Sequence, residues 1–108
     1  MASKVLSLGQ CAADDWTITQ FLRDKFQAEV VPADTAPEAL TYLRDSQINL
    51  VLVNRIFDRD GDSGLSFIGQ LKKNATLADV PVMLVSNYPD AQLQAVALGA
   101  LPLSLIHI

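Results

Sequence analysis

The chain has 108 residues, of which half are hydrophobic and 19% are charged, with a formal net charge of −4. This length suits one domain with one core, and the hydrophobic fraction excludes an intrinsically disordered chain. The acidic balance provides no basic surface, so neither nucleic acid nor an anionic membrane is expected as a partner. The single cysteine excludes an internal disulfide and a cysteine-based metal cluster.

The N-terminal residues run directly into a strand-like segment and lack the apolar region of a signal peptide. No apolar run has the roughly 20 residues that a membrane-spanning helix needs. We therefore expect a cytoplasmic protein.

The first part of the chain alternates strand and helix patterns. Residues 5–8 form a short apolar strand, and Asp14 or Asp15 is expected to cap the helix that follows. On this helix, apolar residues recur at the spacing of one helical face: Ile18, Phe21, Leu22 and Phe26. Residues 29–31 predict a second strand, which we expect to end at Pro32.

A capping box marks the start of the second predicted helix. Thr35 and Glu38 have the spacing of the box, and Pro37 stands in the first turn, where proline is tolerated. The apolar residues expected on the inner face of this helix are Ala39, Leu40 and Leu43.

Residues 49–54, Asn-Leu-Val-Leu-Val-Asn, are four apolar residues between two asparagines. Such a run is typical of a central strand that is covered on both faces of a parallel sheet. In open α/β sheets, ligands bind beyond the carboxyl ends of the strands. The sequence therefore places Asn54 at the functional edge of the sheet.

The second half repeats the same alternation. A polar loop, 55–63, leads to a helix with three apolar residues on one face, Leu65, Ile68 and Leu71. Lys72 and Lys73 close that helix, where cations complement the helix dipole. Residues 81–86 predict a fourth strand, and a fourth helix begins at residues 87–90 and stops at Gly99. Four strand–helix pairs predict an α/β fold with helices on both faces of a parallel sheet.

Residues 103–108, Leu-Ser-Leu-Ile-His-Ile, match the translation of a transposase adapter end used in sequencing libraries. We therefore expect one domain over residues 1–102, a non-native tail over 103–108, and a chain truncated before its last helix. The alternative is a genuine fifth strand. Without that strand, residues 81–86 would form a hydrophobic sheet edge that favours association.

The order of these elements, with Asn49–Asn54, Ser63-Gly64-Leu65, residues 81–86 and Leu98-Gly99-Ala100, resembles the receiver domain of two-component response regulators. The resemblance covers residues 4 to about 102. It implies a flavodoxin-like, doubly wound parallel sheet with strand order 2-1-3-4-5.

The resemblance also implies which positions carry chemistry. In the family, an aspartate ending the third strand accepts a phosphoryl group, and here that position holds Asn54. The acidic pair that helps bind Mg²⁺ falls on Gly9 and Gln10, the switch hydroxyl on Ser86, and the lysine of the fifth strand on Ile106. An amide cannot form an aspartyl-phosphate, and neutral residues are poor Mg²⁺ ligands. We therefore expect a degenerate site without a metal or other cofactor.

Several acidic residues could substitute for the missing ones. Asp58, Asp60 and Asp62 alternate like the first ligands of a calcium loop, but Ser63 and Gly69 stand where an EF-hand needs glycine and glutamate. A solvated turn explains this loop more simply. A substitute phosphoacceptor among these aspartates, or Asp14 leaning into the site, is a further alternative.

Trp16 and Tyr88 flank the predicted site from two helices. We expect both side chains to be half-buried packing residues, with a partner surface as the alternative.

We therefore predict a receiver-like signalling domain of a phosphorelay that acts by protein contact and is not an enzyme. The expected partner is a histidine kinase, an output domain or another signalling protein, and the expected surface lies around Leu84–Ser86 and the helix from Pro89. One alternative is a working phosphoacceptor that uses a substitute aspartate. The other is a flavodoxin-like binder of a small ligand or nucleotide.

Overall fold

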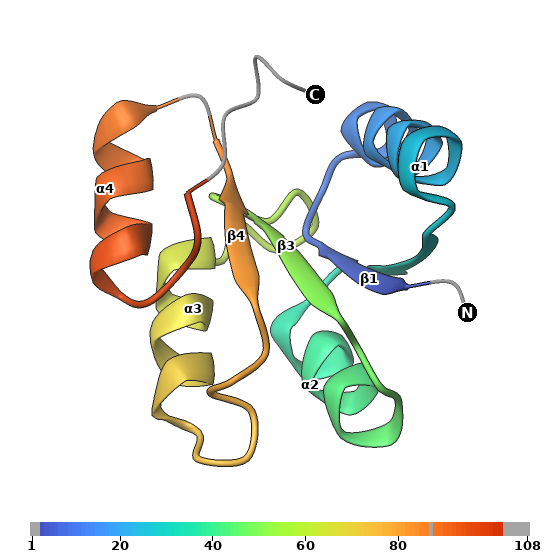
Figure 1. Ribbon diagram of the computed structural model, residues 1–108. Helices are drawn as coiled ribbons and strands as arrows, with labels where there is room; N and C mark the ends of the chain where they lie inside the picture. The colour runs from blue at the N-terminus through green and yellow to red at the C-terminus, as the bar shows by residue number, and fades with distance from the viewer. Residues whose placement is uncertain (1–2, 87, 103–108) are drawn as a thin grey trace.

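The structure is a computed structural model that describes residues 3–86 and 88–102. Strands and helices alternate along the described residues (Figure 1). In chain order the elements are β1 (Lys4–Leu8), α1 (Ala12–Phe26), β2 (Glu29–Ala33), α2 (Ala36–Asp45), β3 (Leu50–Asn54), α3 (Gly64–Lys73), β4 (Val82–Val85) and α4 (Pro89–Ala97).

All strand pairs are parallel, and the strand order is β2-β1-β3-β4. This order confirms the predicted α/β fold and the first four positions of the expected 2-1-3-4-5 sheet. After α4 the chain returns to the free edge of β4, where the Leu101 N–H donates to the Val82 carbonyl at 2.8 Å and Leu101 bridges to Met83. The predicted tail, with Ile106, lies outside the described residues, so the expectations about it stay predictions.

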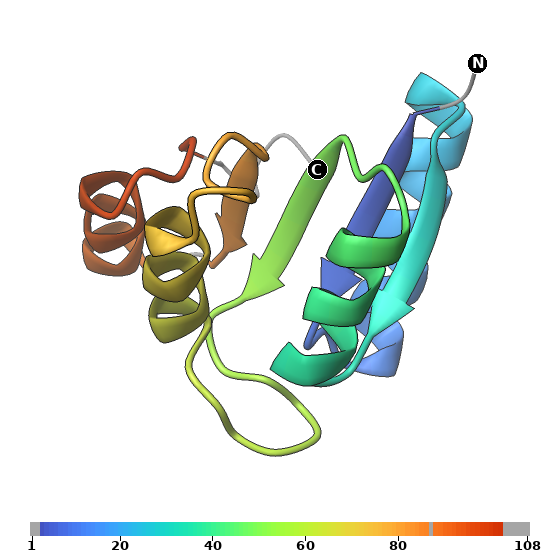
Figure 2. The same cartoon turned by 90° about the horizontal axis from the view of Figure 1, so that it is seen from below.

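Helices cover the sheet on both faces, as predicted (Figure 2). On one face, apolar residues of β1 and β3 pack against α2, α3 and α4; among the completely buried ones are Leu6, Leu8, Val51, Val53, Ile68 and Ala95. On the other face, Val5 and Leu52 pack against Ile18 of α1. The alternation of side chains along each strand produces this division.

The second strand is longer than predicted, because it continues through Pro32 to Ala33. Pro32 pairs with Ser7 of β1, and β2 is the edge of the described sheet. A proline is tolerated on an edge strand because its missing N–H faces away from the neighbouring strand. The fourth strand is shorter than predicted, since Pro81 and Ser86 flank it.

The predicted details of α1 were partly wrong. Cys11 is the N-cap residue, and Asp14 and Asp15 lie in the first turn, where their charge still complements the helix dipole. Ile18 is buried, but the side chain of Phe26 is 65% exposed. The apolar spacing alone overestimated the buried face, because the sheet covers only part of the apolar stripe of α1.

The other helix ends follow the sequence signals more closely. Thr35 is the N-cap residue of α2, but its hydroxyl pairs with the Glu38 carboxylate at 3.3 Å instead of capping the backbone. Ser63 caps α3 by accepting from the Ser66 N–H at 3.2 Å. Gly99, with φ of 109°, follows α4 and turns the chain away, as predicted. No helix in the described ranges has the length and apolar character needed to span a membrane.

Two glycines of α3 offer a matched test of this packing. A Cβ at Gly64 would overlap the backbone carbonyl of Asn54, whereas a Cβ at Gly69 would make an ordinary contact with Leu98 at 3.9 Å. We expect Gly64→Ala to lower the free energy of unfolding by about 2–4 kcal/mol, because backbone must move. Gly69→Ala should raise it by about 0.5–1 kcal/mol, the gain in helix propensity. Urea unfolding measures both, and similar effects at the two positions would contradict the close approach of α3 to β3.

Candidate functional site

The carboxyl end of β3 opens into a cleft at the edge of the sheet. The cleft has a volume of about 490 Å³ and lies between α1 and β4. Its described lining residues are Asp14, Asn54, Arg55, Ile56, Val85, Ser86 and Tyr88. The structure therefore brings together Asn54, Ser86 and Asp14, three of the residues that the sequence singled out.

The side-chain amide of Asn54 bonds to nearby backbone groups through both its nitrogen and its oxygen. Its Nδ2 donates to the carbonyls of Gly9, at 3.0 Å, and Ile56, at 2.8 Å. Its Oδ1 accepts from the Arg55 N–H at 3.0 Å. A carboxylate has no N–H to give to the two carbonyls, so an asparagine suits this position better than an aspartate. The amide acts as a structural link between the loops after β1 and β3.

Gly9 lies beneath an aromatic ring. Its φ is 75°, and a Cβ there would overlap the ring of Phe57, a residue that is only 1% exposed. The Gly9 carbonyl also accepts from the Asp58 N–H at 3.0 Å. Phe57 makes an edge-to-face contact with Phe67 of α3, with ring centroids 6.5 Å apart. Packing against an apolar ring disfavours a charged group or a hydrated cation at this position.

Gln10 is buried and does not face the cleft around Asn54. Its Nε2 makes long hydrogen bonds to the carbonyls of Leu8, at 3.4 Å, and Leu52, at 3.5 Å. The two positions where the resemblance expects carboxylates thus hold a glycine covered by a ring and an amide turned toward the sheet.

Ser86 at the end of β4 already has a role in the fold. Its hydroxyl oxygen accepts from the Tyr88 N–H at 3.1 Å, which fixes the turn into α4. The residue is 8% exposed. The hydroxyl acts as the acceptor in this bond, so its O–H can still donate to another group.

The aspartates of the loop after β3 do not enter the cleft around Asn54. Asp60 accepts from the Asp62 N–H at 3.0 Å, and Asp62 accepts from the Ser63 N–H at 3.3 Å. These local bonds are typical of turn-forming aspartates. Across residues 3–86 and 88–102, no three acidic, histidine or cysteine side chains converge as a metal site would require. Asp14 is the one carboxylate among the described residues that line the cleft.

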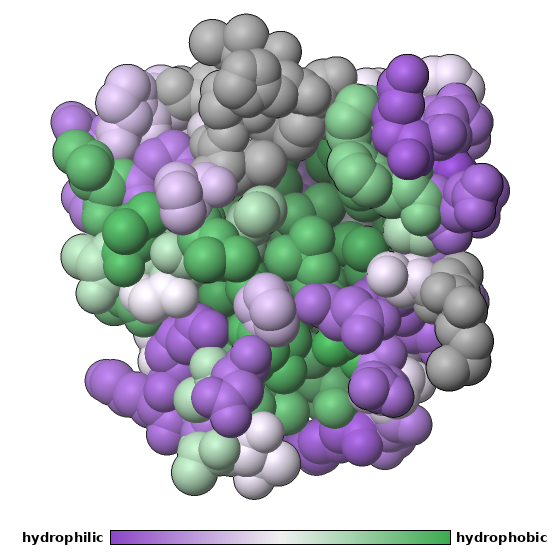
Figure 3. All heavy atoms as spheres, in the orientation of Figure 1, coloured by the Kyte–Doolittle hydropathy of each residue, from purple (hydrophilic) through white to green (hydrophobic). Residues whose placement is uncertain are grey.

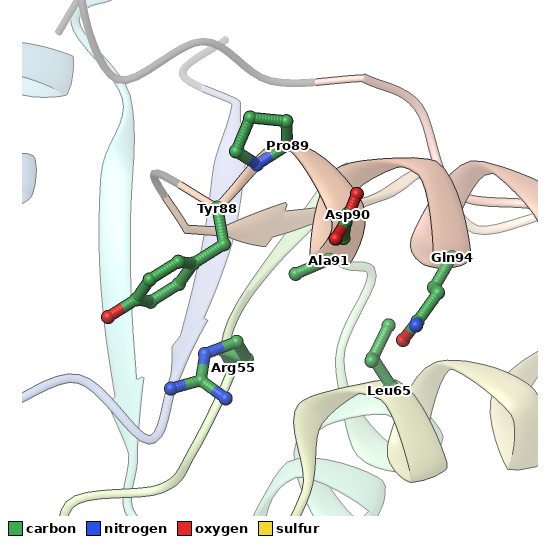
Figure 4. A pocket seen from close by; sticks show the side chains of 7 residues that line it. All are labelled: Arg55, Leu65, Tyr88, Pro89, Asp90, Ala91 and Gln94. Carbon is green, nitrogen blue, oxygen red and sulfur yellow. The ribbon is translucent and has the colours of Figure 1, made fainter.

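Arg55 and Tyr88 connect this cleft to α4, and the sequence did not identify their contact. The Arg55 guanidinium lies over the Tyr88 ring, 4.8 Å from its centroid, beside a second hollow against α4 (Figure 4). Trp16 and Tyr88 are 67% and 61% exposed, so the prediction that both are half-buried was wrong. Phe57 was also missed, although an aromatic residue inside a polar loop is a signal that the loop folds back onto the core.

No protein-family model and no curated protein matches this sequence. Solved structures do match the fold. A response regulator receiver protein from Pseudomonas putida has a TM-score of 0.76 and 21% identity, with 94% of this chain and 83% of that chain covered. The signal receiver domain of a DNA-binding response regulator from Colwellia psychrerythraea has a TM-score of 0.78 and 23% identity, covering 93% and 82%. The phosphorylated cyanobacterial phytochrome response regulator RcpA has a TM-score of 0.77 and 23% identity, covering 93% and 77%. The chain therefore has the receiver fold.

The contact between Gly9 and Phe57 can be tested against a glycine with the same backbone conformation. Gly61 has a φ of 72° but nothing within 4 Å of an added Cβ, whereas the added Cβ of Gly9 meets the Phe57 ring. We expect Gly61→Ala to lower the free energy of unfolding by about 1–2 kcal/mol, the cost of a positive φ. Gly9→Ala should cost at least about 1 kcal/mol more, because the ring must shift.

A double-mutant cycle with Phe57→Ala completes this test. The two changes Gly9→Ala and Phe57→Ala should be strongly non-additive, since removal of the ring removes the overlap. Equal costs for the two glycine variants, or additivity in the cycle, would show that the ring does not rest on Gly9.

Proposed function

We propose that this chain is a receiver-like signalling domain that is not phosphorylated at Asn54 and acts by binding a protein partner. The proposal rests on the receiver fold together with a site in which Asn54, Gly9 and Gln10 provide no carboxylate. The observation that carries it is the Asn54 amide, which donates to the carbonyls of Gly9 and Ile56. The chain acts as a binding module, not as an enzyme.

The chemistry of the site supports this proposal. Transfer of a phosphoryl group to a protein needs a carboxylate that attacks and a divalent cation that neutralises charge on the phosphoryl oxygens. Asn54 provides an amide, and Gly9 and Gln10 provide no charge. Mg²⁺ prefers oxygen ligands that include carboxylates, so its affinity for this site is weak.

The proposed contact surface is the outer side of α4 and the turns at its two ends. Only Ala91 and Ala95 of this helix are buried. Large apolar and aromatic side chains are exposed along it, namely Tyr88, Leu93, Val96, Leu98 and Leu101. Hydrophobic surface is visible where α4 lies and across the middle of the same face (Figure 3). Exposed large apolar side chains gathered on one helix are typical of protein contacts.

Direct hydrogen bonds hold this surface in place without a phosphoryl group. Gln92 Nε2 donates to the carbonyls of Leu84, at 2.7 Å, and Ser86, at 3.0 Å, which joins α4 to the end of β4. The stacking of Arg55 on Tyr88 joins the loop after β3 to the same helix. These contacts favour one fixed arrangement of α4. In this proposal the domain signals by binding its partner through that fixed surface.

A working phosphoacceptor remains a second candidate function because Asp14 lines the same cleft as Asn54 and Ser86. Asp14 lies in the exposed first turn of α1. This placement separates it from Asp58, Asp60 and Asp62, which belong to the loop after β3.

Incubation with a small phosphodonor and Mg²⁺ distinguishes the two candidates. We expect no base-labile phosphoryl group on the unmodified chain, because no carboxylate stands at the end of β3. The Asn54→Asp variant should also stay unmodified, since the metal ligands at Gly9 and Gln10 are still missing. Intact-mass measurement detects the adduct. Stoichiometric modification that disappears in Asp14→Asn, but persists in Asp58→Asn, would establish Asp14 as the acceptor and overturn the proposal.

Charge introduced on α4 tests the contact surface. Leu93 is 70% exposed, so Leu93→Glu should leave the unfolding free energy unchanged but weaken binding to a kinase or output-domain partner by about tenfold or more. Gln94→Glu introduces the same charge one residue away and should have less than about a twofold effect. Calorimetric titration of the partner measures both affinities. Equal affinities for the two variants would place the contact elsewhere.

A further inference from the structure

Arg55 stands where two hollows of the surface meet. It lines the cleft at Asn54, and it also lines a hollow of about 390 Å³ against α4, which we call the α4 hollow. Figure 4 shows the side chains around the α4 hollow, with the Arg55 guanidinium beside the Tyr88 ring. The apolar residues of its lining are Leu65, Tyr88, Pro89 and Ala91. A hollow of this volume can hold a small ligand or one part of a peptide.

The fold uses the backbone of Arg55 but not the charge of its side chain. The Arg55 N–H donates to Asn54 Oδ1 at 3.0 Å, and its carbonyl accepts from the Gly64 N–H at 2.8 Å. The half-buried guanidinium stacks on the Tyr88 ring and has no carboxylate partner among the described residues. Stacking uses the face of the guanidinium and leaves the N–H groups in its plane for an acceptor. The ring therefore holds a cation in place that still lacks an anion.

The chemistry around Arg55 selects a carboxylate as that anion. The guanidinium fork pairs with a planar carboxylate through two parallel hydrogen bonds. A phosphate group fits the same fork but carries more negative charge. Asp14 lines the cleft and Asp90 lines the α4 hollow, so repulsion disfavours a dianion more than a monoanion. Figure 4 shows the Asp90 side chain apart from the guanidinium, so Asp90 does not fill the place of the anion.

The α4 hollow provides apolar surface next to the guanidinium. The Tyr88 ring is largely exposed and Leu65 is half-buried, so an aliphatic side chain placed between them would remove apolar surface from water. The hollow is also continuous with the exposed surface of α4, because Gln94 lines it and follows Leu93. A protein partner that covers α4 would therefore extend over the hollow and reach Arg55.

We propose that Arg55 and the α4 hollow bind an acidic residue of the protein partner together with an aliphatic residue beside it. The carboxylate pairs with the guanidinium, the aliphatic side chain packs against Leu65, and the Tyr88 ring keeps the guanidinium in position. This inference rests on the proposed function, because the partner is the one that contacts α4.

The test is a titration of the full chain with two capped peptides, acetyl-Leu-Glu-Leu-amide and acetyl-Leu-Gln-Leu-amide, followed through backbone amide shifts. We expect saturable shifts at Arg55, Leu65 and Tyr88. The peptide with the carboxylate should bind at least about tenfold more tightly, which corresponds to about 1.4 kcal/mol. Equal affinities of the two peptides would show that no carboxylate is recognised, and would overturn the proposal.

Two arginine variants from the same loop show where the carboxylate binds. Arg55→Gln should weaken binding of the glutamate peptide by about tenfold, and it keeps the fold because the hydrogen bonds of Arg55 come from its backbone. Arg59→Gln removes the same charge from an exposed side chain that lines neither hollow, so it should bind the peptide normally. Urea unfolding checks that both variants are folded. Equal loss of affinity in the two variants would indicate only a general attraction of charge, and would contradict a site at Arg55.

Two further outcomes decide the chemistry and the link to the partner. Inorganic phosphate that displaces the glutamate peptide at lower concentration than acetate would overturn the choice of a carboxylate. Absence of saturable shifts with both peptides would overturn the inference but not the proposed function, since Leu93→Glu tests the partner contact on α4 separately.

Discussion

The ring of Phe57 on the backbone of Gly9 is the contact on which the functional edge of this domain depends. The ring lies against Gly9 at the end of β1, and the Asn54 amide donates to the Gly9 carbonyl. Together they join the loops after β1 and β3 into one packed unit. The ring and the Asn54 amide, which donates to two backbone carbonyls, place no charge of their own at the end of β3.

Three acidic residues near this edge of the sheet have two different surroundings. Asp14 lines the cleft at Asn54, whereas Asp15 and Asp58 line a separate hollow of about 220 Å³ beside Ser7 and Gln10. Adjacent positions in the first turn of α1 point in different directions because successive helical residues are rotated by about 100°. Acidic side chains therefore lie near this edge of the sheet, but the end of β3 itself has the amide of Asn54.

The order of the elements was predictable because hydrophobic periodicity and strand–helix alternation reflect short-range constraints. The position of Asn54 at the carboxyl edge followed from the same reasoning. Phe57 was not predictable as the cover of Gly9, since that contact joins residues far apart in sequence. The exposure of Trp16 and Phe26 was also missed, because amphipathic spacing does not reveal how much of a helix its neighbours cover. The N-cap at Cys11 could not be predicted from residue type, because cysteine is not a favoured N-cap residue and no side-chain cap bond forms there.

The central claim is that the end of β3 is closed to a divalent cation and to phosphoryl transfer. A titration with millimolar Mg²⁺, followed through the side-chain amide resonances of Asn54 and the backbone amide of Gly9, tests it most directly. Our account predicts that these signals keep their positions, with only small uniform changes due to ionic strength. Saturable shifts confined to Asn54, Gly9 and Phe57 would show that a cation enters the site, and would contradict the account.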